Sequence, residues 1–542
     1  MTDPIIDVVD LFAGPGGLGE GFASLSEVFR ILVSAECSAP AHQTLRLRAF
    51  KRLLEREGHP LEGYYDYVSG RALSPVTPQT EAAWQQAERE ALKLELGRKG
   101  DDKKLTEALD REQLKRRKDW VLIGGPPCQA YSLVGRARNR GNTGYVPEED
   151  KRHFLYLEYL KLIRDYRPAV FVMENVKGML SSEVGGQRIF HQILKDLTRP
   201  DEALNLPREG NGYRIHSLMG EGIVYEHGDD ISEFTRAFGH EAFLVRAEYF
   251  GVPQTRHRVF LVGIREDLQG VVPRALRYAD HESAVSDVLA DLPALRSGLS
   301  RQDTEDSWRK TVMTRGNQLA LEAAAAGESA IADELVSQLN KLADTRFLMT
   351  GGPQVPKQGM SIDPRKAKRL RSWLECERLD VWLNHQARAH MPSDLGRYLY
   401  AAAFANVKKR PPVGAEDFNL PSLAPNHANW ASGKFADRFR VQPWNQASKT
   451  VTSHISKDGN YYIHPDPWQC RSFTVREAAR IQTFPDDYFF EGNRTQQYQQ
   501  VGNAVPPWLA RQIAEVVHQV LYDAGLTSTH TTDAHKREHS LA

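Results

Sequence analysis

Cysteine, excess charge of one sign and long apolar runs are all scarce in this chain of 542 residues. The four cysteines form no Cys-x-x-Cys pair, which argues against a zinc knuckle or a disulfide framework and favours a reducing compartment. The 70 basic residues balance the 70 acidic ones, so net charge gives no evidence for a nucleic-acid partner, although a local basic patch would suffice. Without a membrane-length apolar run or a basic-then-apolar N-terminus, we expect a cytoplasmic protein with no membrane partner.

The remaining composition is that of an ordinary globular protein. Hydrophobic residues make up 41% and charged residues 26% of the chain, and its length suffices for two or three domains. Short apolar runs recur between helical stretches, at Ile5–Phe12, Arg30–Ala35, Trp120–Ile123 and Ala169–Met173. Such runs predict buried strands of an α/β fold with a doubly wound, mostly parallel sheet.

A glycine-rich turn, from Ala13 to Gly21, follows the first of these strands and opens a helix. Glycines let a backbone approach a ligand closely, and Glu36 ends the second strand at the spacing of an acid that binds ribose hydroxyls. Pro15 lacks an N–H group that a pyrophosphate would need, which argues against a dinucleotide. The segment therefore indicates a nucleoside-containing cofactor, and the alternative is a structural turn followed by a surface glutamate.

A cysteine lies on the loop after the third strand. In Gly124-Gly125-Pro126-Pro127-Cys128, two glycines and two prolines break regular structure and deliver Cys128 at the carboxyl end of a strand. Open α/β sheets bind ligands at that edge. A lone cysteine is more often a small buried hydrophobe, but a buried cysteine has no need of so rigid an approach. Cys128 is therefore a candidate nucleophile.

Three charged side chains follow in positions that could face the same edge. Glu174, in Glu-Asn-Val, comes at the end of the next strand, where Asn175 is expected to brace the loop. Arg256 and Arg258 are two residues apart, so on a strand they would share one face. Surface glutamates and arginines are common, and each of these signals is weak alone.

Taken in order, these segments resemble the motifs of the DNA cytosine-C5 methyltransferases. The resemblance also includes Gly502-Asn503-Ala504-Val505, and it extends from Asp10 to Leu509 with little match between Leu268 and Gln469. It implies a Rossmann-like core that binds S-adenosyl-L-methionine and releases S-adenosyl-L-homocysteine, with a smaller inserted target-recognition domain. No metal is implied.

The resemblance assigns roles around the cofactor. Phe12 would face the adenine, Glu36 would hold the ribose, and Pro126 would touch the cofactor from the cysteine loop. Asp66 is the best candidate for an acid near the adenine. The cofactor-binding residues implied in this way are Phe12, Gly14, Gly16, Gly17, Glu36, Pro126, Asn503 and Val505.

The resemblance also implies a covalent mechanism. Carbon 5 of cytosine is a poor nucleophile, and addition of the Cys128 thiolate at carbon 6 makes an enamine that can attack a methyl donor. Glu174 would bind the ring at N3, Arg258 would contact O2, and Arg256 would support the thiolate. A base stacked in a duplex is out of reach, so the cytosine must be flipped out of double-stranded DNA.

The domain boundaries follow from the motif order and from changes in composition. The segments 268–469 and 470–525 are expected to form the target-recognition domain and the return to the core. A helical insert is expected at about 38–119 within the core, 1–267, and a disordered tail at 526–542.

Local patterns predict individual elements in these segments. Residues 79–118 read as helical, and 450–463 as a hairpin leading back to the core. Thr474 and Glu477 predict a capping box, and Pro507 the start of a helix.

Family members of this plain architecture are typically bacterial modification enzymes, which implies a monomer associated with DNA and paired with a restriction endonuclease of the same site. One alternative is a tRNA cytosine-5 methyltransferase, although the Cys-Phe-Thr signature usual in that branch is absent. Another is a non-catalytic DNA-binding relative that retains the fold.

Overall fold

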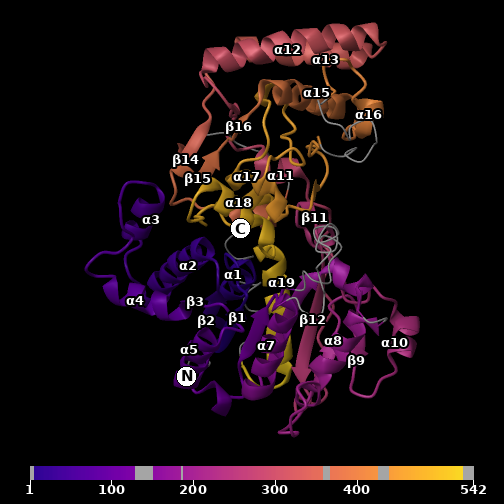
Figure 1. Cartoon of the computed structure of the whole chain (residues 1–542). Helices are drawn as coiled ribbons and strands as arrows, with labels where there is room; N and C mark the ends of the chain where they lie inside the picture. The colour runs from indigo at the N-terminus through magenta and orange to yellow at the C-terminus, as the bar shows by residue number, and fades with distance from the viewer. Residues whose placement is uncertain (1–4, 128–150, 185–186, 358–366, 425–438, 529–542) are drawn as a thin grey trace.

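The computed structural model describes residues 5–127, 151–184, 187–357, 367–424 and 439–528. Two lobes are visible in Figure 1. We call residues 5–284 with 504–528 the sheet lobe, and residues 285–503 the upper lobe. None of the helices within the described ranges has the length and apolarity needed to cross a lipid bilayer.

A nine-stranded mixed sheet forms the centre of the sheet lobe, within the described residues. Its strand order is β3-β2-β1-β4-β5-β12-β8-β9, and β10 pairs with β12. The strands are β1 (Ile6–Leu11), β2 (Phe29–Glu36), β3 (Ala91–Lys93), β4 (Val121–Gly124), β5 (Val170–Val176), β8 (Tyr213–His216), β9 (Val224–Tyr225), β10 (Leu244–Arg246) and β12 (His257–Arg265).

The direction of β12 determines which residues meet at one edge. Strands β1 to β5 run parallel, whereas β12 runs antiparallel to β5, with Arg258 opposite Val176. The amino end of β12 therefore lies beside the carboxyl ends of the parallel strands. This edge faces the upper lobe, since Arg256, directly before β12, contacts Val451, and Pro15 in the loop after β1 contacts Tyr488.

Helices cover both faces of the sheet because side chains alternate along each strand. In β1, Val9 and Leu11 pack toward α5 (Lys99–Arg111), α7 (Lys151–Tyr166) and α8 (Ile189–Thr198). Ile6 and Val8 pack toward α1 (Gly17–Ala23) and α19 (Pro507–Asp523). The predicted doubly wound α/β class is confirmed, and α19 begins at Pro507 as expected.

The predicted helical insert contains α2 (Ala39–Glu57), α3 (Glu62–Val68), α4 (Glu81–Glu90) and α5. The prediction that residues 79–118 are helical is wrong at Ala91–Lys93, which form β3 and extend the sheet beside β2. This strand is short and buries Ala91, a residue of high helix propensity, so tertiary packing overrides the local preference.

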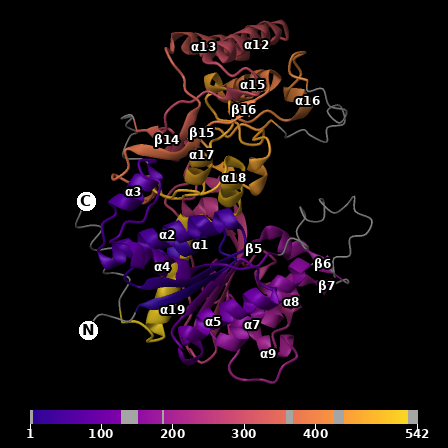
Figure 2. The same cartoon turned by 60° about the vertical axis from the view of Figure 1, so that its left-hand side comes forward.

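Helix α3 leaves the sheet lobe and reaches the upper lobe (Figure 2). Gln354 Nε2 donates to the Val68 carbonyl at 2.9 Å, and the Tyr67 hydroxyl donates to Glu491 at 2.7 Å. Leu379 and Leu383 of the upper lobe join the apolar cluster formed by α2, α3 and α4. We call α3 and these partners the brace, because they tie the insert to the upper lobe.

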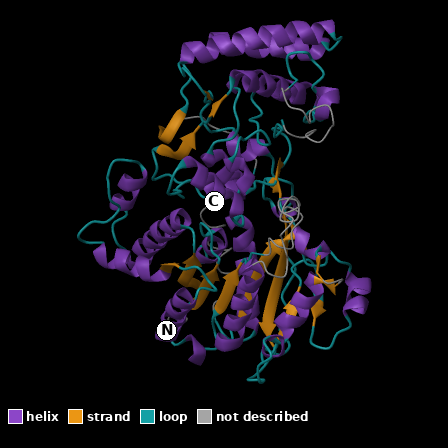
Figure 3. Ribbon diagram, in the orientation of Figure 1, coloured by secondary structure: helices purple, strands orange, loops and turns teal. Residues whose placement is uncertain are grey.

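The upper lobe is mainly helical (Figure 3). Its own apolar cluster joins α12, α13 and α15, which are farthest from the sheet, and a second cluster joins α11, α14, α17 and α18. The elements are α11 (Val285–Leu289), α12 (Glu305–Ala325), α13 (Ser329–Asp344), β14 (Gly351–Pro356), α14 (Lys368–Leu374), β15 (Val381–Gln386), α15 (Pro392–Lys408), α17 (Val475–Ile481) and α18 (Arg494–Asn503).

Two local predictions for the upper lobe have different outcomes. The capping box of α17 is confirmed, since the Thr474 hydroxyl accepts from the Glu477 amide and the Glu477 carboxylate accepts from the Thr474 amide. The predicted hairpin at 450–463 is wrong. Residues Ser453–Ser456 form a 3-10 turn, and β17 (Ser448–Lys449) pairs in parallel with β11 (Gln254–Thr255).

Short elements complete the described chain. They are β6 (Glu183–Val184), β7 (Gln187–Arg188), α9 (Pro200–Ala203), α10 (Ile231–Phe238), β13 (Gly298–Leu299), β16 (Ala389–His390) and α16 (Gly414–Asp417). Of the predicted tail, Leu526 packs partly buried against the sheet lobe, and residues 529–542 lie outside the described ranges.

Candidate active site

The glycine turn after β1 is tied to the end of β2. The Gly14 amide donates to Glu36 Oε2 at 2.9 Å, and the Ser38 amide donates to Glu36 Oε1 at 2.7 Å. Phe12 and Gly14 have left-handed backbone angles, with φ of 56° and 59°. This backbone conformation favours glycine at position 14, and the turn brings the half-buried Phe12 ring and the Glu36 carboxylate to the same edge of the sheet.

The segment after α18 lies directly on this turn. A Cβ atom at Gly17 would come within 2.2 Å of the Val505 carbonyl oxygen, so a side chain cannot be accommodated there. Asn503 ends α18 with an exposed side chain, whereas Val505 is 9% exposed. The structure thus brings Val505 against the glycine turn, although the two segments are at opposite ends of the chain.

Asp10 lies beneath the turn and is 1% exposed. Its two carboxyl oxygens have no hydrogen-bond partner among the described residues, and burial raises its pKa to about 8. Arg52 lowers this pKa and Glu36 raises it, each by less than burial does. The Asp10 carboxyl is therefore neutral at pH 7 in the folded protein.

Asparagine at position 10 is expected to remove a pH dependence of stability. Above about pH 5 the unfolded chain releases the Asp10 proton, while the folded chain keeps it up to about pH 8. Because the folded state binds more protons in this window, the free energy of unfolding falls as pH rises through it. Unfolding midpoints of wild type and Asp10→Asn at pH 6, 7, 8 and 9 test this, and parallel curves would contradict it.

Glu174 and Arg258 meet where β5 and β12 lie side by side. Arg258 Nε is 2.8 Å from Glu174 Oε1, and both side chains are about 15% exposed. A Cβ atom at Gly125 would lie 3.0 Å from Glu174 Oε2, so this carboxylate faces the loop that leads to Cys128. Asn175 Nδ2 donates to the Pro126 carbonyl at 3.1 Å, which confirms the expected bracing of that loop.

Arg256 has different neighbours from Arg258. It precedes β12 rather than lying in the strand, and its Nη1 donates to the carbonyls of Val451 at 2.8 Å and Gly502 at 3.4 Å. Burial, with Arg258 nearby, lowers its pKa. Arg256 is not in the strand, which begins at His257, but both arginines lie near Glu174.

Several predicted features are placed elsewhere or fall outside the structure. Cys128 lies outside the described residues, and the described chain ends before it at Pro127. Asp66, the candidate for the acid near the adenine, is on α3, half exposed and paired with Arg71 at 2.9 Å. The strand next to β2 is β3, and the amide of Leu94, directly after β3, donates to the Glu36 carbonyl at 3.0 Å.

Tyr488 is a residue of this site that the sequence did not reveal. It is 1% exposed, and its hydroxyl donates to the carbonyl of Pro15 in the glycine turn at 2.5 Å. Nothing in the local pattern marks it, since its partner is near the other end of the chain.

Comparison with known proteins places the chain in a family. The model of the C-5 cytosine-specific DNA methylase family matches residues 93–201 and 233–519. The type II methyltransferase M.Bpa9945I of Bacillus paralicheniformis is 30% identical over 95% of this chain and 99% of its own. M.AgeI of Thalassovita gelatinovora is 26% identical over 94% and 98%. The DNA (cytosine-5-)-methyltransferase M.ApeKI of Aeropyrum pernix is 25% identical over 74% and 81%. With its family motifs at one edge of a doubly wound sheet, the chain belongs to the C-5 cytosine-specific DNA methylases.

Proposed function

We propose that this chain methylates carbon 5 of a cytosine flipped out of double-stranded DNA, through a covalent bond between Cys128 and carbon 6. The observation that carries the proposal is the contact of Glu174 with Arg258 against Gly125, on the loop that leads to Cys128. A carboxyl group and a guanidinium held together beside the loop that leads to a cysteine are groups suited to bind the polar edge of a cytosine whose ring a thiolate attacks.

The glycine turn supports S-adenosylmethionine as the methyl donor. A Cβ atom at Gly14 would meet nothing within 4 Å, so the turn is open at this point, whereas Gly16 and Gly17 are closely covered. Glu36 would turn its carboxylate to the ribose hydroxyls. The cofactor, when bound, supplies an electrophilic methyl group on a sulfonium. The residues that would line it are Phe12, Gly14, Gly16, Gly17, Glu36, Pro126, Asn503 and Val505.

The protein side chains divide the reaction into addition and elimination. The Cys128 thiolate adds to carbon 6, and the ring electrons move to carbon 5 while Glu174 would act as the acid toward N3. Arg258 would hold O2, and the positive charge of Arg256 would favour the thiolate. Once carbon 5 carries the methyl group, a base removes its proton, the C5–C6 double bond re-forms, and the C6–S bond breaks to return the thiolate. N3 then gives its proton back to Glu174.

We also propose the domain assignment 1–267 for the core and 268–469 for target recognition, with 470–525 leading from the upper lobe back to the core. On the basis of the family alone, we propose that the protein is a cytoplasmic, monomeric modification enzyme. It would protect the sites of a cognate restriction endonuclease.

Duplex oligonucleotides that carry 5-fluorocytosine test the covalent step. Carbon 5 then bears fluorine in place of the proton that must leave, so the enzyme is trapped on the DNA. With S-adenosylmethionine and a pool of duplex sequences, we expect an adduct that survives denaturation and maps by mass spectrometry to the peptide containing Cys128.

Two variants control the trapping experiment. Cys128→Ser should bind cofactor but form no adduct and transfer no methyl group, whereas Cys376→Ser, at a half-buried thiol of the upper lobe, should behave as wild type. Full activity of Cys128→Ser would overturn the proposal. Transfer to tRNA but not to duplex DNA would favour the tRNA enzyme, and DNA binding without transfer would favour the non-catalytic relative.

A further inference from the structure

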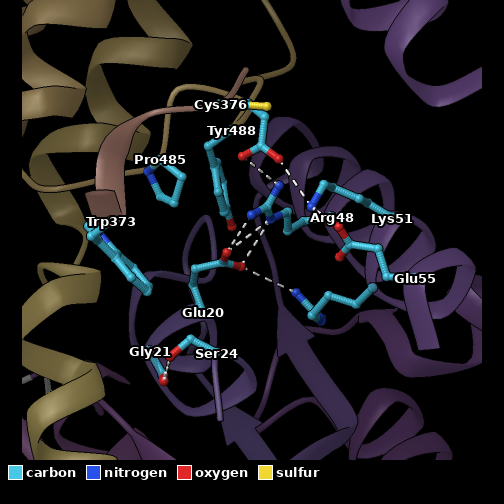
Figure 4. Close-up of polar contacts among 12 residues, drawn as sticks. Glu20, Gly21, Ser24, Arg48, Lys51, Glu55, Trp373, Cys376, Pro485 and Tyr488 are labelled. Atoms are coloured by element: carbon cyan, nitrogen blue, oxygen red, sulfur yellow. Dashed lines mark hydrogen bonds and ion pairs between the residues drawn. The ribbon is translucent and has the colours of Figure 1, made fainter. Parts of the chain in front are cut away.

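A buried cluster of charges joins the glycine turn, the insert and the upper lobe (Figure 4). Arg48 of α2 lies between Glu20 of α1, at 2.5 Å, and Asp487 of the segment after α17, at 3.1 Å. Lys51 also contacts Asp487 at 3.1 Å. These four side chains are 7 to 8% exposed, so each charge depends on its partners for stabilisation.

The charges in the cluster support one another. Burial alone would raise the pKa of Asp487, but Arg48 and Lys51 outweigh it, so the pKa is lowered and the carboxylate stays ionised. The Tyr64 hydroxyl of α3 donates to the Asp487 carbonyl at 2.8 Å. The segment around Asp487 is therefore held in a fixed position relative to α1, α2 and α3.

Tyr488, the next residue, connects the segment around Asp487 to the glycine turn. The Arg48 guanidinium lies over its ring, 4.9 Å from the centroid, and its hydroxyl donates to Pro15. The amide of Gly16, in the same peptide group as the Pro15 carbonyl, donates to the Ala13 carbonyl at 2.9 Å. This peptide group is thus held at both of its polar atoms.

Steric contact reinforces the hydrogen bond. Gly16 has a φ of +95°, and a Cβ atom there would lie 2.9 Å from the Tyr488 hydroxyl and 2.7 Å from Leu45. The turn is consequently packed against Tyr488 on one side, while Gly14 on its other limb faces open space. Because Pro15 and Gly16 are held in place, the backbone at Gly14, in the same turn, is also restricted in position.

We propose that Tyr488 is a positioning residue that holds the glycine turn in its cofactor-binding shape. The inference rests on the proposed binding of S-adenosylmethionine at this turn. It means that a residue supplied by the upper lobe tunes the affinity for cofactor without touching the reacting atoms. Removal of its hydroxyl should weaken cofactor binding and leave the chemical step unchanged once the site is saturated.

The test compares two full-length variants, Tyr488→Phe and Tyr213→Phe. Tyr213 is a matched control, since it is also 1% exposed and its hydroxyl also donates to a proline carbonyl, that of Pro168, at 2.9 Å. It lies far from the site, because its strand β8 pairs with the end of β12 that is distant from Arg258. Calorimetric titration with S-adenosylmethionine should show about 3- to 10-fold weaker binding for Tyr488→Phe, the effect of one hydrogen bond. The control should match wild type, and kcat at saturating cofactor should stay within about twofold for both.

Hydrogen exchange provides a readout without cofactor. The amides of Ala13, Gly14, Gly16 and Gly17 should exchange faster in cofactor-free Tyr488→Phe and at the wild-type rate in Tyr213→Phe. Unchanged exchange and affinity in Tyr488→Phe, or equal changes in both variants, would overturn the inference. If wild type binds no S-adenosylmethionine, the proposed function fails, and the exchange rates still decide whether Tyr488 shapes the turn.

Discussion

Glutamine at position 174 is expected to lower kcat by about 10²- to 10⁴-fold, the usual contribution of a positioned acid. Glutamine has nearly the same shape and can still accept a hydrogen bond from Arg258, now 2.8 Å from the carboxylate. It cannot take up a proton and so cannot act as an acid toward N3 of the cytosine. Initial rates of methyl transfer to duplex DNA at saturating cofactor measure the effect.

Glu241→Gln is the matched control for this variant. Glu241 also pairs with an arginine, Arg246 at 2.7 Å, and with Lys177 at 2.7 Å, but its side chain is 47% exposed. It should leave kcat unchanged. Glu174→Gln should keep the wild-type affinity for S-adenosylmethionine and the wild-type unfolding midpoint, and a kcat within threefold of wild type would refute the role of Glu174.

Glu477→Gln should be the most destabilising of the substitutions considered, by about 3–5 kcal/mol, the usual cost of breaking a buried ion pair. Both Glu477 oxygens are 2.7 Å from Arg471, and each side chain is 1% exposed. Glutamine can preserve the capping box with Thr474, so the loss comes from the uncompensated charge of Arg471. Urea unfolding at pH 7.5 measures it.

The destabilisation caused by Glu477→Gln is expected to depend on pH. Burial would raise the pKa of Glu477, but Arg471 and His464 outweigh burial, so the pKa in the folded protein is lowered. A lowered pKa stabilises the folded state above about pH 4.5 and loses this contribution as pH falls toward the folded value. The difference between wild type and Glu477→Gln should therefore shrink below pH 4.5.

A solvent-exposed ion pair provides the control for the buried pair of Glu477 and Arg471. Arg71 and Asp380 are 3.0 Å apart with side chains 46% and 69% exposed, and Asp380→Asn should leave the midpoint almost unchanged because exposed ion pairs contribute little. An equal loss of unfolding free energy in Asp380→Asn and Glu477→Gln would show that burial does not determine how much an ion pair contributes to stability.

The strands that build the site were predictable because each is a short, mostly buried and mostly apolar run. Strand β1 is buried at every residue, and the Thr474 capping box is a local pattern of two side chains. Glu174 and the loop to Cys128 follow from such runs. Their closeness to Arg258 also depends on the antiparallel direction of β12, which no local pattern specifies.

The features that were missed depend on partners distant in sequence. Ala91–Lys93 form a strand because β2 is available beside them, against their local preference. Arg256 faces carbonyls of Val451 and Gly502, which only the folded chain brings near. Tyr488 and Arg48 likewise acquire their roles from tertiary contacts.

The brace has a consequence for making chimeras of this enzyme. A transplant of the segment 268–469 alone from a relative would replace Gln354, Asp380 and Leu383. Val68, Arg71 and Tyr65 would then face foreign residues. Since α3 belongs to the insert in the other lobe, altered target specificity by domain exchange should require that residues 62–71 be exchanged together with the donor segment.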